Sequence, residues 1–87
     1  VMHACGHDMH MTVFIGTARA LVENKKFWKG TLVMIAQPSE ENGLGATAMI
    51  KDKVYDKIPY PDVAIALHNH AGLKAGTIGY SLGAFMA

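Results

Sequence analysis

Three short groups of residues carry side chains that can bind a cation or move a proton. Cys5 and His7 lie two positions apart, Glu40 and Glu41 are adjacent, and His68 follows an apolar run. In an extended segment alternate side chains project from one face, so the thiolate and the imidazole can reach one cation. Adjacent carboxylates point in different directions, so one can bind a cation while its neighbour transfers a proton. These donors predict a metal site suited to zinc and, less well, to manganese or cobalt.

Each group also has an ordinary structural interpretation. Cys5 can be an inert buried thiol beside a histidine at a strand end, and a Glu-Glu pair is commonly part of a solvated loop. A lone histidine at the position of His68 is commonly a structural residue. His10, one turn into an expected helix, is interpreted as a packing residue or as support for a ligand. The six methionines share no spacing and are interpreted as core residues. The metal-site hypothesis therefore depends on the three groups meeting in space.

Two helices are expected to position these groups. Apolar residues recur every three or four positions after Asp8, which predicts a helix with Asp8 as its N-cap and an end near Asn24. Good helix formers predict a second helix over residues 44–51. Residues 54–62 contain two prolines and no clean period, and they predict a surface connection.

Two apolar runs predict buried strands. Residues 31–36 and 62–67 are continuous, rich in β-branched side chains and followed by polar residues. Alternation of such strands with helices predicts an α/β fold with a mostly parallel sheet, in which all carboxyl ends meet at one edge. Residues 76–86 are expected to be extended.

Composition excludes several classes of protein. The 87 residues are 51% hydrophobic and 17% charged, with a formal net charge of +1. This balance argues against disorder, and no basic patch favours nucleic acid or a membrane surface. No apolar stretch is long enough to cross a bilayer. The single cysteine excludes an internal disulfide and favours a reducing compartment, so a cytoplasmic location is expected.

Four stretches form a recognisable series: MHACGHDMH at 2–10, QPSEE at 37–41 followed by Gly45-Ala46, ALH at 66–68, and GTIG at 76–79. Their order and spacing resemble the aminoacylase, hippurate hydrolase and auxin-conjugate amidohydrolase family of dimetal metallopeptidases. The resemblance implies a three-layer α/β sandwich, as in phosphorylase/hydrolase-like zinc-peptidase catalytic domains. It also implies a homodimer formed through a separate lid domain.

The resemblance also implies a role for each candidate residue. Cys5, His7, Glu41 and His68 correspond to ligands of two divalent ions, zinc or manganese, with cobalt or nickel possible. Glu40 corresponds to the general base. The implied activity is hydrolysis of the amide bond of N-acyl amino acids or related peptides and conjugates.

The family's last metal-binding histidine, its lid domain and its first strands have no counterpart in these residues. Residues 1–87 are therefore expected to form the central part of a catalytic domain and to be inactive alone. One alternative is a non-catalytic or metal-binding piece that needs further chain. A thiol-based redox protein using Cys5 is another, although no second cysteine could resolve a sulfenic acid.

Overall fold

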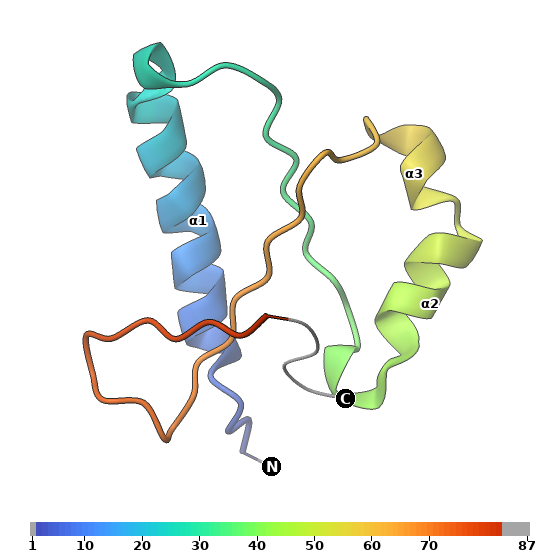
Figure 1. The fold of residues 1–87 in the computed structure, drawn as a ribbon. Helices are drawn as coiled ribbons and strands as arrows, with labels where there is room; N and C mark the ends of the chain where they lie inside the picture. The colour runs from blue at the N-terminus through green and yellow to red at the C-terminus, as the bar shows by residue number, and fades with distance from the viewer. Residues whose placement is uncertain (1, 83–87) are drawn as a thin grey trace.

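Three helices and two long extended segments account for most of residues 2–82. The computed structural model describes residues 2–82. Helix α1 spans His7–Glu23, α2 spans Leu44–Lys51 and α3 spans Val54–Lys57. Single 3₁₀ turns occur at Lys25–Phe27 and Glu40–Asn42. In Figure 1, α1 lies on one side of the molecule and α2 with α3 on the other, with the two extended segments between them.

Helix α1 confirms the helix predicted from the apolar periodicity, but it begins earlier than expected. Its N-cap is Gly6, in the left-handed conformation with φ 70°, and not Asp8. Asp8 lies in the first turn, where its negative charge interacts favourably with the positive end of the helix dipole. The helix ends next to Asn24 as predicted, and the Asn24 side-chain amide donates to the carbonyl of Ala20 at 2.8 Å.

One face of α1 is turned toward the rest of the molecule. Its half-buried residues are separated by three or four positions, as one stripe of a helix requires. Two histidines share this stripe with apolar side chains. Its members are His7, His10, Phe14, Ala18 and Leu21.

The predicted three-layer sandwich with a parallel sheet is wrong for the described part of the chain. Residues 2–82 contain no strand, and no backbone hydrogen bond joins residues 31–36 to residues 62–67. A strand is stable only when a neighbour completes its ladder of hydrogen bonds. Without that neighbour, both runs remain extended segments, although their composition is that of buried strands.

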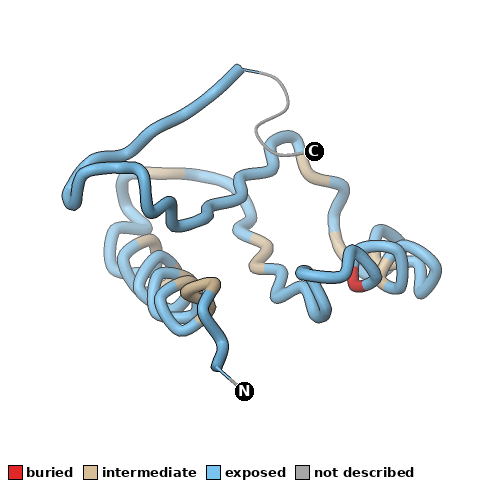
Figure 2. The backbone as a smooth tube through the Cα atoms, turned by 90° about the horizontal axis from the view of Figure 1, so that it is seen from below, coloured by how far each residue is buried: buried red, intermediate tan, exposed pale blue. Residues whose placement is uncertain are grey.

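Many apolar side chains of these two runs are in contact with solvent, above all those of residues 62–67. Ile65 is 90% exposed and Val63 is 76% exposed, and no hydrophobic residue between 2 and 82 is buried. The radius of gyration is 14.9 Å, whereas a compact chain of this length has about 12 Å. Figure 2 shows the open path of the backbone, with a single buried position in α2. The described residues therefore lack a closed core.

The second half of the chain departs from expectation in one further place. Helix α2 has the predicted bounds, but the predicted surface connection at 54–62 contains the short helix α3. Residues 76–82 form no helix, in line with the extended prediction, and residues 83–86 lie outside the described part. No described helix combines the length and apolarity needed to cross a membrane.

Candidate metal centre

Three of the predicted ligands lie together. One donor atom each from Cys5, His7 and Glu41 lie within 4.8 Å of one another. The glutamate is 34 positions from the histidine in the sequence, so this grouping is a property of the fold. A thiolate, an imidazole and a carboxylate at such separations can bind a common divalent cation after small side-chain adjustments.

Cys5 and His7 approach each other by a route that the sequence did not predict. The expectation was an extended segment whose alternate side chains share a face. Instead, Gly6 turns the chain with φ 70° and ψ 27°, and His7 is already the first residue of α1. A left-handed turn is accessible to glycine without a steric penalty, so Gly6 allows the thiol and the imidazole to face the same carboxylate.

The two glutamates lie on the 3₁₀ turn that precedes α2. Left-handed residues bound this turn on both sides, Ser39 with φ 49° and Gly43 with φ 68°. The Nε2 atom of His7 is 3.0 Å from Oε1 of Glu41 and 3.7 Å from Oε2 of Glu40. Glu41 therefore makes the direct contact with His7, and the Glu40 carboxylate lies next to this pair.

The thiol and the carboxylate of the group perturb each other. A hydrogen bond to Glu41 raises the pKa of the Cys5 thiol, and partial desolvation and the charge of Glu41 act in the same direction. The same hydrogen bond lowers the pKa of Glu41, with a further contribution from the hydrogen bond to His7. A cation bound by both groups would take the place of the thiol proton.

His68 lies at the same hollow but outside the close group of three. The hollow has a volume of about 310 Å³, and its lining includes Cys5, Glu40, Glu41 and His68. The Nδ1 atom of His68 is 2.6 Å from the carbonyl oxygen of Asn69. In the tautomer that donates this hydrogen bond, Nε2 carries the lone pair that a metal ligand needs.

Asn69 is a site residue that sequence reasoning missed. Its amide group lines the hollow and contacts His10 from α1. The only available signal was its position in a polar group directly after an apolar run. His70 has a different environment, because its Nδ1 accepts the backbone N–H of Gly72 at 3.0 Å.

The residues present fit a divalent cation by their chemistry. Sulfur, nitrogen and oxygen donors are the common ligands of zinc, and mixed sets also occur with other transition metals. The side chains are open to solvent, with 42% of His7 and 55% of Glu41 exposed. The donor side chains are therefore accessible from solvent.

A thiol, an imidazole and a carboxylate that could hold a cation lie beside a second carboxylate, and these are residue types that metal-dependent hydrolase centres use. The chain belongs to peptidase family M20/M25/M40, whose family model matches residues 1–83. Members of this family are in general metal-dependent. This membership confirms the family resemblance stated from the sequence motifs.

Individual relatives agree with the family assignment. The chain is 44% identical over 87 residues to an N-acetyl-L-cysteine deacetylase of Bacillus subtilis (strain 168), covering 100% of this chain and 20% of the relative. It is 40% identical over 86 residues to IAA-amino acid hydrolase ILR1-like 6 of Arabidopsis thaliana, covering 99% and 18%. It is 37% identical over 87 residues to an N-acetyldiaminopimelate deacetylase of Lactiplantibacillus plantarum, covering 100% and 22%. The chain thus spans about a fifth of these relatives, and no solved structure matches it.

Proposed function

We propose that the whole protein carrying these residues is a metal-dependent amidohydrolase that cleaves the amide bond of N-acyl amino acids or related conjugates. One observation carries the proposal: donor atoms of Cys5, His7 and Glu41 lie within 4.8 Å of one another, with Glu40 beside them. The relatives' names support the reaction, because deacetylation of an N-acetyl amino acid and hydrolysis of an IAA-amino acid both break an amide bond.

Four residues would hold the cations. Cys5, His7 and Glu41 supply one donor each, and His68 faces the same hollow with Nε2 free in the tautomer described above. The proposed occupants are two divalent ions, zinc or manganese, with cobalt or nickel as possible substitutes. Bound there, such ions would lower the pKa of a water molecule and polarise the substrate carbonyl.

Glu40 is proposed as the general base. Its carboxylate lies 3.7 Å from the predicted ligand His7, close enough to reach a water molecule bound in the hollow. It would take a proton as the water oxygen attacks the amide carbon, and return that proton to the amine as the C–N bond breaks. Glu41, engaged by His7 and Cys5, is unsuited to this role because its lone pairs are directed to the ligand group.

We also propose a cellular location and an assembly state. A single cysteine suits the reducing cytoplasm. A homodimer is proposed because the family that the motifs resemble commonly dimerises through its lid domain.

The test uses the full-length protein. Metal is removed with a chelator, and release of free amine from N-acetyl amino acids and an indole-acetyl conjugate is measured before and after addition of zinc or manganese. The proposal expects activity that disappears with the metal and returns with it. Full activity in the chelated, metal-free protein would refute it.

A second candidate is favoured by the lack of a closed core. No hydrophobic side chain in residues 2–82 is buried, which suits a piece that folds only against further chain. Under this hypothesis the 87 residues bind metal weakly or not at all and have no activity alone. Parallel assays of the 87-residue chain and the full-length protein test this candidate: activity in the full-length protein alone supports it, and activity of the short chain would exclude it.

A further inference from the structure

We propose that His10 and Asn69 form a latch that positions His68 at the metal centre. The inference rests on the proposed function and adds to it a positioning role for two residues. They lie 59 positions apart, one on α1 and one just after the second extended segment. The pair is called the His10–Asn69 latch below.

Two contacts converge on one ring nitrogen. The backbone N–H of Asn69 donates to Nε2 of His10 at 3.0 Å, and the Asn69 side-chain Oδ1 lies 3.1 Å from the same nitrogen. One neutral tautomer of the imidazole accepts the backbone N–H, and the other donates to Oδ1. Each tautomer therefore holds Asn69, by its backbone or by its side chain.

The Asn69 amide also packs directly over Gly6. A Cβ atom built on Gly6 would lie 2.4 Å from Nδ2 of Asn69 and 2.8 Å from its Cγ. A side chain at Gly6 would therefore displace the Asn69 amide from its present position. The latch thus contacts the turn that presents two predicted ligands.

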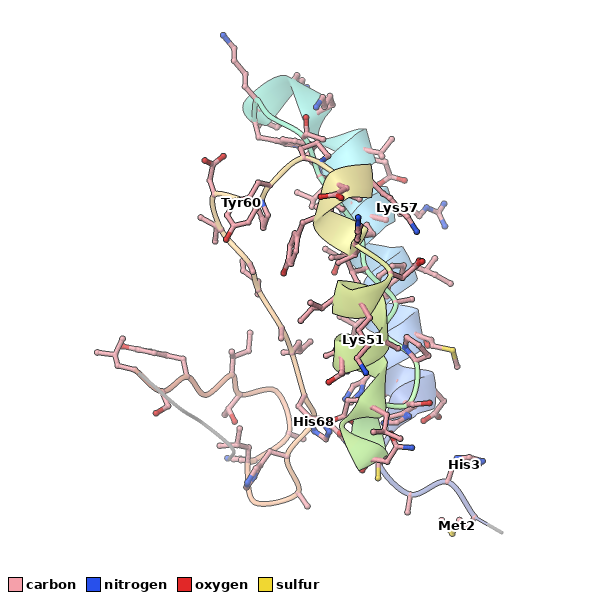
Figure 3. The ribbon with its side chains drawn as sticks, turned by 90° about the vertical axis from the view of Figure 1, so that its right-hand side faces the viewer. Met2, His3, Lys51, Lys57, Tyr60 and His68 are labelled. Carbon is pink, nitrogen blue, oxygen red and sulfur yellow. The ribbon has the colours of Figure 1, made fainter. Side chains whose placement is uncertain are left out.

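The latch places the predicted ligand His68 beside the others. The His10 ring lies edge-on to the His68 ring with centroids 4.6 Å apart, and 5.6 Å from the His7 ring. His7 and His10 share the half-buried stripe of α1, three positions apart. Figure 3 shows His68 beside the helices and His3 on the separate N-terminal stretch.

His10 is therefore a positioning residue and not a ligand. Its Nε2 is engaged by Asn69, and it lies outside the close group of Cys5, His7 and Glu41. Within the described part of the chain, no hydrogen bonds to a neighbouring strand fix residues 62–67. The contacts of Asn69 with His10 therefore contribute much to the position of His68. Loss of a residue that orients a metal ligand commonly weakens metal binding about 10- to 100-fold.

The experiment measures zinc affinity of the full-length protein by competition with a chelator. His10→Leu removes the acceptor, His10→Gln keeps an acceptor oxygen of similar reach, and Asn69→Ala removes the amide over Gly6. His3→Leu is the matched control, since it removes a histidine that is exposed and makes none of these contacts. Circular dichroism shows whether each variant is folded, and absorption of the cobalt-substituted protein reports the ligand set.

The expected result is a zinc affinity about 10- to 100-fold weaker for His10→Leu and Asn69→Ala, with His10→Gln within about threefold of the unchanged protein. The cobalt spectrum should lose intensity in the d–d region and retain the thiolate charge-transfer band of Cys5. If His10→Leu fails to fold, the zinc affinities of His10→Gln and Asn69→Ala test the latch.

Three outcomes overturn the latch: folded His10→Leu with unchanged affinity and spectrum, folded His10→Gln as weak as expected for His10→Leu, or Asn69→Ala equal to the unchanged protein. In each case the unchanged protein still binds zinc and hydrolyses substrate, so the proposed function stands. Failure of the unchanged protein to bind zinc would overturn both.

Discussion

Substitution of Gly45 by alanine should disrupt the site from a position that carries no chemistry. Gly45 is the buried residue at the start of α2. A Cβ atom there would lie 1.5 Å from the carbonyl oxygen of Pro38 and 2.6 Å from its carbonyl carbon. Because the obstacle is backbone, no side-chain rotation relieves the overlap. The chain at Pro38 or the first turn of α2 must move.

The size of the movement follows from these distances. Real Cβ contacts essentially never fall below 3.0 Å, so the carbonyl oxygen must retreat by about 1.5 Å. Pro38 is followed directly by Ser39 and the 3₁₀ turn that carries Glu40 and Glu41. Misplacement of a catalytic group by about 1 Å can cost about 100-fold in rate. We therefore expect kcat/KM of Gly45→Ala to fall at least about 100-fold, or about 3 kcal/mol of transition-state stabilisation.

The assay is release of free amine by the full-length, zinc-loaded protein, together with its metal content and thermal unfolding. Gly16→Ala is the matched control, because Gly16 lies inside α1 with nothing within 4 Å of a built Cβ. That control should keep its activity and gain about 0.5–1 kcal/mol of stability, since alanine favours a helix interior over glycine. Normal activity of Gly45→Ala would refute the reasoning that Gly45 sets the position of the glutamates.

Three further predictions concern the site itself. Glu40→Gln should lower turnover by several orders of magnitude, because the amide cannot accept the proton, and should leave the metal content unchanged. An activity assay measures the turnover and elemental analysis measures the metal content. Normal turnover would contradict the assignment of Glu40 as the base. Cys5→Ser should lose metal, since a hydroxyl is a poor replacement for a thiolate, and full occupancy by plasma mass spectrometry would argue against ligation. The Glu41 hydrogen bond raises the pKa of Cys5, so cation binding must release the thiol proton. Zinc affinity should therefore rise about tenfold per pH unit between about pH 7 and pH 8, a slope that calorimetry in two buffers can measure and that Cys5→Ser should flatten.

The residues of the candidate site could be predicted from residue types alone. Cys5, His7 and Glu41 have side chains of the types that bind cations, so a metal site could be predicted before the geometry was known. The family could also be predicted from the sequence, because the order and spacing of the motifs are visible there. The contacts of Asn69 could not be predicted, because an asparagine after an apolar run has no chemical signature, and only its position against Gly6 and His10 distinguishes it.

Local sequence was sufficient to predict α1 and α2 but not the short α3, and tertiary structure decided what depends on a distant partner. Helix α1 forms hydrogen bonds within its own residues, so its periodicity was sufficient to predict it. A strand forms its hydrogen bonds with another segment, so the strand-like composition of residues 31–36 and 62–67 did not establish a sheet. The meeting of Glu41 with His7 across 34 positions likewise depends on the path of the chain between them, which no local pattern encodes.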